Sequence, residues 1–347
     1  MVSVVMSVYD GERHLGEAIE SILRQTFHDF EFIVINDGSK DETGTILFRY
    51  EKLDPRMRVY HQENHGLIYC LKKGCDLAQG KYIARMDADD VSMPQRFSEQ
   101  VQYMEANREI GILGTWIEYI DEIGASLGEW SPPSKPAVIE WLLLFGNCLA
   151  HPSVMMRRDV VEKVGSYRDE ALYVEDYDLW ARSVHVTQLA NIPLPLVKRR
   201  ICEKGVSLQH YQEQEENAVK IMHAMMTQLM EREISDEVIA KLRLCRKNCD
   251  AISIEEGDLL AALLRRLHRL FLRKHKLSDP EAKQVARDVG NRLLHLAERV
   301  TEGSLYKGLA IYSQVFELKP SLITFPIAKK ILRAVVERWF LSPWSQS

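Results

Sequence analysis

Four short strand patterns alternate with helical patterns over the first 87 residues of this 347-residue chain. Continuous apolar runs, at 2–8 and 30–35, are typical of strands covered on both faces, and we expect two further strands at 57–61 and 82–86. Apolar residues recur at helical spacing between them, over 15–23, 43–53 and 67–78. This order predicts an α/β fold with a doubly wound, mainly parallel sheet. In such sheets, ligands bind beyond the carboxyl ends of the strands.

Both the pattern and the charge of the chain change near residue 210. The formal net charge is −9 up to this point and +4 beyond it. Before it, further strands are expected within 110–131 and at 151–157 and 196–201, and helices at 137–145, 158–164 and 176–185. Beyond it, helical spacing dominates, at 213–231, 235–250, 257–275, 280–300, 305–318 and 327–341. The sequence therefore predicts an α/β domain over 1–210 and an α-helical domain over 211–347.

Several classes of protein are disfavoured by what the sequence lacks. The net charge of −5 argues against a nucleic-acid partner. No run approaches the 18 apolar residues of a membrane-spanning helix, and the N-terminus lacks the basic segment of a signal peptide. The six cysteines do not form a zinc-binding pattern, so we expect reduced thiols. Glycine-rich dinucleotide and P-loop motifs are also missing. We expect a cytoplasmic protein, with any membrane contact peripheral and on the inner face of the cytoplasmic membrane.

Three groups of acidic residues are expected at the edge of the sheet where a ligand would bind. Asp37 follows the second strand, Asp87, Asp89 and Asp90 follow the fourth, and Glu175-Asp176 opens a later helix. Alternate carboxylates in an extended turn suit a hard divalent ion, Mn²⁺ or Mg²⁺. Simpler interpretations stay open, because Asp89 and Asp90 could cap the helix expected after Pro94. Likewise, Asp37 fits a turn, and Asp176 fits the positive end of a helix dipole.

Together these segments resemble a known family. The resemblance rests on motifs spread over roughly residues 1–210: Ser7-Val8-Tyr9, Asn36-Asp37-Gly38-Ser39, Asn64-His65-Gly66-Leu67, Ala84-Arg85-Met86-Asp87-Ala88-Asp89-Asp90 and Glu175-Asp176-Tyr177-Asp178-Leu179-Trp180. In this order they look like the bacterial family 2 inverting nucleotide-sugar glycosyltransferases. The resemblance implies a GT-A fold, a nucleotide-sugar donor and a divalent metal.

The resemblance also implies roles for individual residues. Donor contacts would come from Ser7, Tyr9, Asp37, Arg85 and Asp87. Of these, Tyr9 and Asp37 would contact the nucleotide base, Arg85 the base or phosphates, and Asp87 the ribose or donor sugar. Asp89 would bind the metal that bridges the diphosphate. Asp176 would be the general base that takes the proton from the acceptor hydroxyl, with Glu175 beside it as a supporting residue.

Two further residues near this site each have two interpretations. His151 precedes Pro152-Ser153 on an expected strand and resembles a recurrent His-Pro-Ser of bacterial members. It lines the site or packs structurally. Trp180 shares a helix face with Asp176, four residues earlier. It could stack on an acceptor sugar, although core packing is the simpler interpretation.

One position departs from the family's pattern. Members often carry Arg-x-His near the end of the catalytic domain, and the matching stretch here begins Arg200-Ile201-Cys202. Cys202 therefore stands where a histidine would help to hold metal or diphosphate. A softer ligand, a metal held without this position, or a weaker closing loop would each explain it. The missing positive charge could come from Arg199, Arg200 or Lys204.

The function expected from these features is metal-dependent inverting transfer of one sugar. The donor would be a nucleotide sugar, most simply a UDP-sugar, and the acceptor a hydroxyl of a glycan or lipid-linked oligosaccharide, as in surface polysaccharide synthesis. One alternative is a non-catalytic nucleotide- or carbohydrate-binding module on a degenerate scaffold, for which Cys202 is the only support. Nucleotidyl transfer is disfavoured, because the turn after the first strand is neither glycine-rich nor basic.

The helical region is basic where it is amphipathic. Leucines from 259 to 270 and Phe271 form an apolar stripe, flanked by Arg265, Arg266, Arg269, Arg273 and Lys274. A similar pattern recurs at 327–341. Three interpretations remain: a helical bundle, an interfacial surface for anionic lipid, or a homodimer contact.

Overall fold

The computed structural model describes residues 1–202, 210–244, 253–301, 311 and 313. The chain divides into two compact units, Met1–Ile221 and Met222–Ser347, which are described separately. None of the helices within the described ranges has the length and hydropathy needed to cross a membrane. Outside the described residues lie the expected helix at 327–341, the one at 305–318 apart from residues 311 and 313, the end of the one at 235–250, and Lys204.

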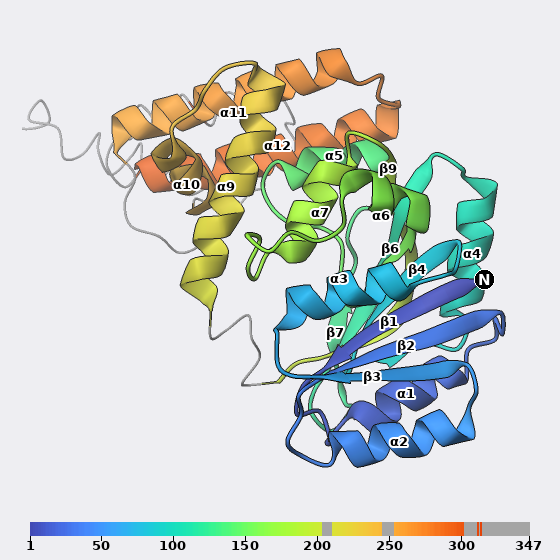
Figure 1. The fold of residues 1–347 in the computed structure, drawn as a ribbon. Coiled ribbons are helices and arrows are strands. Elements are labelled where there is room, and N and C mark those ends of the chain that lie inside the picture. The colour runs from blue at the N-terminus through green and yellow to red at the C-terminus, as the bar shows by residue number, and fades with distance from the viewer. Residues whose placement is uncertain (203–209, 245–252, 302–310, 312, 314–347) are drawn as a thin grey trace, which may run out of the picture. The chain divides into compact units, whose positions relative to one another are not determined.

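The first unit contains one mixed sheet (Figure 1). Its strands are β1 (Val2–Val8), β2 (Phe30–Asp37), β3 (Met57–Gln62), β4 (Tyr82–Asp87), β5 (Val91–Ser92), β6 (Ile110–Ile120), β7 (Ser126–Trp130), β8 (Met155–Arg157) and β9 (Gln188–Arg200). They are ordered β3-β2-β1-β4-β8-β6-β9-β5, with β7 paired to β6. The four strands predicted first pair in parallel, and β8 is antiparallel to β4 and β6. The mainly parallel α/β fold is confirmed at this N-terminal half.

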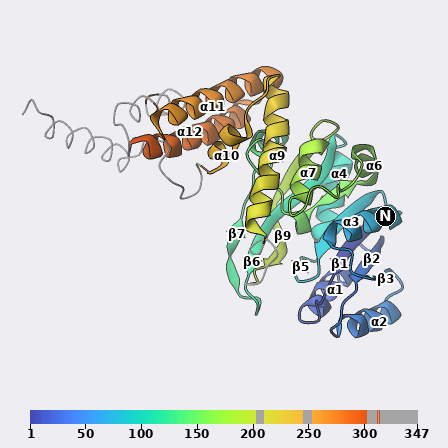
Figure 2. The same cartoon turned by 60° about the vertical axis from the view of Figure 1, so that its left-hand side comes forward.

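Helices cover both faces of the parallel strands. The helices of this unit are α1 (Leu15–Leu23), α2 (Thr43–Leu53), α3 (Leu67–Leu77), α4 (Arg96–Ala106), α5 (Pro136–Leu143), α6 (Arg158–Val164) and α7 (Glu175–Ser183). Figures 1 and 2 show α1 and α2 on one face of β1–β3 and α3 on the other. On the α3 side, a Cβ added to Gly74 would lie 2.3 Å from the Val5 side chain, so this close packing requires glycine.

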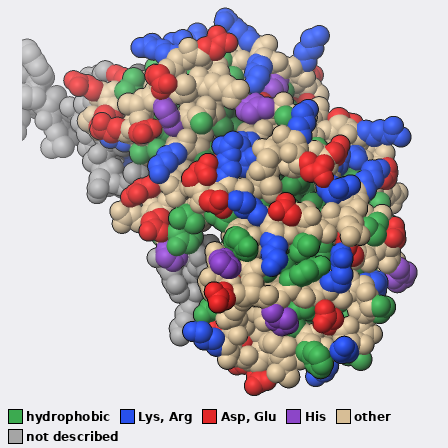
Figure 3. Space-filling view, viewed as in Figure 1, with side chains coloured by type: hydrophobic (Ala, Val, Ile, Leu, Met, Phe, Trp, Pro, Cys, Tyr) green, Lys and Arg blue, Asp and Glu red, His purple; other side chains and the backbone are tan. Residues whose placement is uncertain are grey.

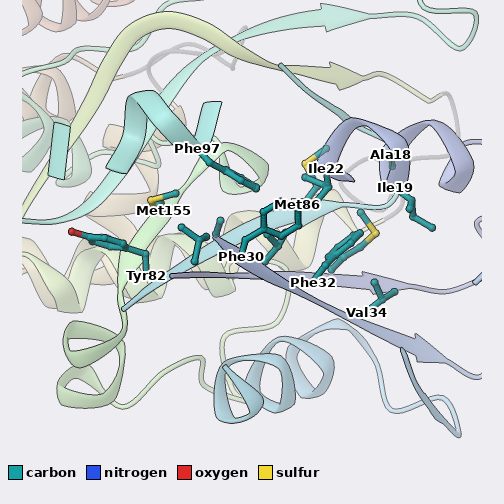
Figure 4. Packing of buried hydrophobic residues seen from close by; sticks show 14 of the residues in the cluster. Ala18, Ile19, Ile22, Phe30, Phe32, Val34, Tyr82, Met86, Phe97 and Met155 are labelled. Carbon is teal, nitrogen blue, oxygen red and sulfur yellow. The ribbon is translucent and has the colours of Figure 1, made fainter. Parts of the chain in front are cut away.

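The main core lies between the sheet and helices α1, α2 and α4. Alternate residues of β1 point into it, together with the apolar face of α1. Figure 4 shows Phe30, Phe97 and Met86 converging from three elements, and the Phe30 and Phe97 rings meet edge to face at 5.9 Å. Complete burial of such a side chain contributes about 1.5–3 kcal/mol. The core therefore fixes the strands whose ends carry the acidic residues.

Three local predictions differ from the structure. Residues 151–157 are not one strand: a 3₁₀ turn, η1 (His151–Ser153), precedes the short β8, because Pro152 lacks the N–H that a strand ladder needs. The last strand begins at Gln188 rather than 196, and register shifts against β6 accommodate its two prolines. Finally, α4 begins at Arg96 with Gln95 at its N-cap and no side-chain cap, so neither Asp89 nor Asp90 caps this helix.

The second unit is helical in its described part. Helix α9 (Tyr211–Met230) begins in the first unit and ends in the second. It is followed by α10 (Asp236–Leu244), α11 (Ile254–Lys274) and α12 (Asp279–Thr301). A capping box between Ser253 and Glu256 starts α11. Most of the α11 apolar stripe is buried within this unit, at Leu260, Leu263, Leu264, Leu267 and Phe271. Packing therefore explains most of the stripe, and the basic side chains beside it face outward.

Candidate active site

The register of the sheet brings the predicted site residues to one edge. Ser7 near the end of β1 pairs with Ile35 of β2 and with Asp87 of β4. The loops after β1 and β2 are joined by hydrogen bonds, from the Lys40 N–H to Asp10 and from the Gly11 N–H to Thr43. Tyr9, by contrast, is 49% exposed. An exposed aromatic ring beside these loops is available to stack on a planar ligand.

Asp37 is buried and held by three donors. Its Oδ1 accepts from Gln62 Nε2 at 2.7 Å and from the His65 N–H at 2.9 Å, and its Oδ2 accepts from the Gly66 N–H at 2.8 Å. Burial alone would raise the pKa of this carboxyl, but the hydrogen bonds outweigh it and lower the pKa. Asp37 is therefore ionised, and Oδ2 retains capacity for one further donor.

Gly38 allows the loop that carries two of these donors to approach Asp37. Its φ of +80° lies in the left-handed region, and an added Cβ would lie 2.9 Å from the Asn64 nitrogen. A side chain at this position would push away the 62–66 segment and, with it, the N–H groups that hold Asp37. The turn after β2 is thus part of the site and not only a connection.

Three carboxylates come together after β4. One oxygen each from Asp87, Asp89 and Asp90 lies within 4.8 Å of the others. Burial, followed by the negative charge of Asp87, raises the pKa of Asp89 to about 6, and the pKa of Asp90 is raised well above its ordinary range for similar reasons. Asp90 is 1% exposed and its Oδ2 has no hydrogen-bond partner among the described residues. Concentrated charge with an unsatisfied buried oxygen fits a divalent cation.

Arg200 forms structural hydrogen bonds, whereas it was considered from sequence as a source of positive charge for a diphosphate. Its backbone N–H donates to Asp90 Oδ1 at 2.8 Å, and its guanidinium donates to the carbonyls of Asp89, Asp121 and Glu122 and pairs with Glu17 at 2.7 Å. The side chain is buried and its Nε, Nη1 and Nη2 all donate to these partners, so it anchors the acidic loop to the end of β9. Arg200 is therefore poorly placed to supply a free charge to a diphosphate.

Arg85 lies between the acidic groups of the site. It is buried on β4 and forms an ion pair with Asp87. Its positive charge also opposes the upward pKa shifts of Asp89, Glu175 and Asp176. The charge of Arg199 acts in the same direction on Asp89 and Asp176. The positive charges of these two arginines thus favour the ionised forms of Asp89 in the acidic cluster and of Asp176 on α7.

The carboxyl pair opens α7. Asp176 Oδ2 accepts from Asn147 Nδ2 and its Oδ1 from the Tyr177 N–H, both at 2.6 Å. Burial, followed by the charge of Asp176, raises the pKa of Glu175 to about 7, and burial also raises the pKa of Asp176. A carboxylate of raised pKa is a better proton acceptor near neutral pH. The hydrogen bonds from Asn147 and the helix N-terminus hold the charged form of Asp176.

His151 and Trp180 pack behind this pair. His151 Nε2 lies 2.9 Å from the Tyr167 hydroxyl, and its ring meets Trp180 edge-on at 6.0 Å. Burial, followed by the charges of Arg85 and Arg199, lowers the pKa of His151 far below its ordinary value, so the ring is neutral. Trp180 is fully buried, which matches core packing and leaves no ring face for a sugar.

Two residues that sequence analysis did not single out complete the support of the site. Asn147 comes from the loop after α5 and binds Asp176, which is 29 positions later. Arg96 is fully buried on α4 and donates to the carbonyls of Arg85, at 2.9 Å, and Val154, at 3.3 Å. Burial and the charge of Arg85 lower the pKa of Arg96 to about 9, so it stays charged at pH 7. No local motif marks either contact.

Comparison with known proteins decides the family. The model of the Glycosyl transferase family 2 matches residues 3–165. An uncharacterized glycosyltransferase of Haemophilus influenzae is 36% identical over 243 residues, which cover 65% of this chain and 73% of that protein. The O-antigen biosynthesis glycosyltransferase WbnJ of Escherichia coli is 38% identical over 183 residues, covering 52% of this chain and 71% of WbnJ. The chain belongs to glycosyl transferase family 2.

The fold comparison agrees with this assignment. S. aureus TarS 1–349, solved in complex with UDP-GlcNAc, superposes with a TM-score of 0.55 at 15% identity, over 91% of this chain and 90% of that one. The arrangement is therefore the GT-A fold expected from the sequence, with a helical C-terminal region. Within this family 2 glycosyltransferase, Asp87, Asp89 and Asp90 form a group of three carboxylates, within the described residues, that could hold a metal ion.

Proposed function

We propose that this glycosyltransferase moves one sugar from a nucleotide-sugar donor to an acceptor hydroxyl with inversion and with a divalent ion. One observation carries the proposal: Asp87, Asp89 and Asp90 each place one oxygen within 4.8 Å of the others, and the buried Arg85 pairs with Asp87. The charge of Arg85 also lowers the pKa of Asp176, which supports one site for both acidic groups. A cation-binding group for a diphosphate and a basic carboxylate for an acceptor are the two parts that a single displacement needs.

Asp176 would take the proton of the attacking hydroxyl. Its raised pKa makes it a stronger base than a surface aspartate, and Asn147 with the Tyr177 N–H orients both of its oxygens. Glu175 has a pKa near 7 and lies next to it, so it offers a second acceptor into which the proton can pass. Glu175 is buried and Asp176 is half-buried, which leaves Asp176 within reach of an acceptor hydroxyl.

Asp89, with Asp87 and Asp90, would hold Mn²⁺ or Mg²⁺. The bound ion would neutralise the diphosphate leaving group, so that no separate general acid is required. Arg85 and Arg199 are the cationic side chains whose charge acts on this cluster, and they would add to that neutralisation.

The donor is proposed to be a UDP-sugar. Support comes from TarS, which was solved in complex with UDP-GlcNAc. In this chain, Tyr9 would stack on the pyrimidine, Ser7 would lie beneath it, and Asp37 Oδ2 would accept a hydrogen bond from the ring N–H. The acceptor is proposed to be a glycan or lipid-linked oligosaccharide, in keeping with O-antigen biosynthesis by WbnJ.

A donor screen tests the proposal. Thermal shifts with UDP-, GDP- and dTDP-sugars, each with and without Mn²⁺, should show the largest metal-dependent stabilisation with a UDP-sugar. Hydrolysis of that donor should then fall about 10²–10⁴-fold in Asp176→Asn, with donor binding retained. Asp76→Asn, an exposed carboxylate on α3, is the matched control and should keep full activity. Metal-dependent nucleotide binding without turnover on any acceptor would instead support the binding-module alternative.

We also infer that the helical unit contacts an anionic lipid surface, where a lipid-linked acceptor would reside. Side chains of Arg265, Arg266, Arg269 and Arg273 are exposed along α11, with Leu259 (53% exposed) and Leu272 (40% exposed) on the same helix. Figure 3 shows Lys and Arg side chains along the upper edge, where α11 lies in Figure 1. Each basic residue near an anionic surface contributes about 1 kcal/mol.

Vesicle sedimentation tests this contact. Arg266, Arg269 and Arg273 changed together to Glu should lower the affinity for phosphatidylglycerol vesicles by about 100-fold or more. A matched triple reversal of exposed cations in the first unit, at Lys52, Arg108 and Lys163, should have little effect. Equal affinity in both triple variants would overturn the inference. Loss of a dimer on sedimentation of the α11 variant, with no vesicle binding by the native chain, would identify the face as a homodimer contact.

A further inference from the structure

Cys202 lies beside the acidic cluster. It follows the end of β9 by two residues, and its Sγ is 4.0 Å from Asp89 Oδ2. The other described cysteines, Cys70, Cys75 and Cys148, are buried, whereas Cys202 is partly exposed. The acidic cluster also contains the buried Asp90 Oδ2, which has no hydrogen-bond partner in the described part of the chain. Cys202 Sγ therefore lies next to Asp89, one of the three carboxylates of the proposed metal site.

The fold holds the thiol in this place. The Arg200 N–H binds Asp90 Oδ1, and the Arg200 Nε binds the carbonyl of Asp89 at 3.0 Å. Antiparallel pairing of β5 with β9 joins the same two segments, with Val91 opposite Lys198. The end of β9 and the acidic loop are thus connected by several hydrogen bonds within a few residues of Cys202. The short distance between the thiol and Asp89 follows from this connection.

We propose that Cys202 is a ligand of the divalent ion and makes this site prefer thiophilic ions to Mg²⁺. The inference rests on the proposed metal site of the glycosyltransferase. One ion can bind both atoms as they stand, because a metal–sulfur bond of about 2.3 Å and a metal–oxygen bond of about 2.1 Å together span about 4.4 Å. The S–H bond breaks on coordination and its proton passes to solvent, leaving a thiolate on the metal.

The preference follows from ligand chemistry. Mg²⁺ takes oxygen ligands almost exclusively, whereas thiolates favour softer ions such as Zn²⁺ and Cd²⁺, with Co²⁺ also accepting them. Three aspartates alone would form an all-oxygen site with no such preference. Adding one sulfur should therefore strengthen binding of Co²⁺ and Cd²⁺ while contributing little to Mg²⁺.

Metal binding to the full-length protein, without nucleotide, tests the inference. Co²⁺ titration of the native chain should produce a thiolate-to-cobalt charge-transfer absorption, and Cys202→Ser should lose it. The other five cysteines remain in that variant and serve as an internal control. The ratio of Cd²⁺ to Mg²⁺ affinity, measured by calorimetry, should fall about tenfold or more in Cys202→Ser. Alkylation of the peptide that contains Cys202 should slow when Cd²⁺ is present.

The outcomes separate this inference from the proposed function. An absorption that survives in Cys202→Ser, or an unchanged Cd²⁺ to Mg²⁺ ratio, would overturn the role of Cys202. If Asp89→Asn still abolished Mn²⁺ binding in that case, the metal site itself would stand. Thermal unfolding of Cys202→Ser checks that the fold is intact, and Cys202→His, which offers a nitrogen ligand, should restore Co²⁺ affinity without the sulfur absorption.

Discussion

Replacing Asp89 with Asn should stabilise the metal-free protein while removing its metal. The pKa of Asp89 is raised from 3.8 to about 6 by burial and by the charge of Asp87. Each pKa unit corresponds to about 1.36 kcal/mol, so an ionised Asp89 costs the metal-free fold about 1–3 kcal/mol. Asn has the same shape without the charge. At about 2–4 °C per kcal/mol for a domain of this size, the melting temperature should rise by several degrees.

The pH dependence of this gain has a definite sign. Because the folded-state pKa of Asp89 lies above the unfolded value, the native carboxyl binds its proton more tightly, and ionisation destabilises the fold as pH rises from about 4 to about 6. The advantage of Asp89→Asn should therefore be complete above about pH 6 and vanish below about pH 4. Asp76→Asn, an exposed carboxylate on α3, should show neither effect.

Thermal unfolding with a chelator and with Mn²⁺ measures both halves of the prediction. In chelator at pH 8 the variant should melt above the native protein. At 100 times the dissociation constant, Mn²⁺ should stabilise the native protein by about 2.7 kcal/mol and the variant hardly at all. A variant that melts at or below the native temperature in chelator at pH 8 would refute the argument that the cluster stores unfavourable charge.

Three further outcomes are expected. Asn147→Ala removes a donor to the ionised form of Asp176, which raises the pKa of that base. The acid limb of the pH–kcat profile should therefore move to higher pH. An unmoved limb would mean that Asp176 is not the titrating base. Arg200→Ala leaves three carbonyls without their donor, so the free energy of unfolding measured in urea should fall by about 3 kcal/mol. A loss below 1 kcal/mol would mean that water replaces the guanidinium. Gly80→Ala places a Cβ 2.7 Å from the Ser3 nitrogen, so urea unfolding should show a free energy of unfolding that is lower by about 1–3 kcal/mol. An unchanged urea midpoint would show that the edge of β1 can shift.

Sequence predicted the strands and helices of the N-terminal half well, because their signals are local. Apolar runs such as 2–8 and 82–86 specify strands buried on both faces, and strand ends in a parallel sheet converge whatever the loops do. The positions of Asp37 and Asp89 followed from that geometry. Errors occurred where proline changed the local pattern, at His151–Ser153 and in the first half of β9.

Contacts between residues far apart in the chain could not be predicted from the sequence alone. Asn147 binds Asp176 across 29 positions, and Arg96 binds the Val154 carbonyl across 58. A single asparagine in a loop or one arginine on a helix carries no pattern that indicates such a partner. The choice between a charge donor and an anchor for Arg200 likewise depended on its burial and on acceptors up to 183 positions away. These residues decide how rigidly the predicted carboxylates are held.

The acceptors of Arg200 have a consequence for how this enzyme can vary. Its guanidinium binds the main-chain oxygens of Asp89, Asp121 and Glu122, and every amino acid supplies a main-chain oxygen. The Glu122 side chain forms an ion pair with the exposed Arg13, and the Ile123 side chain is 87% exposed, so both side chains can be exchanged at little cost to stability. A library randomised at these two positions should remain folded in most of its members. Side chains in the turn at 122–123 can thus change, while the hydrogen bonds from Arg200 still hold the main chain of the turn in place.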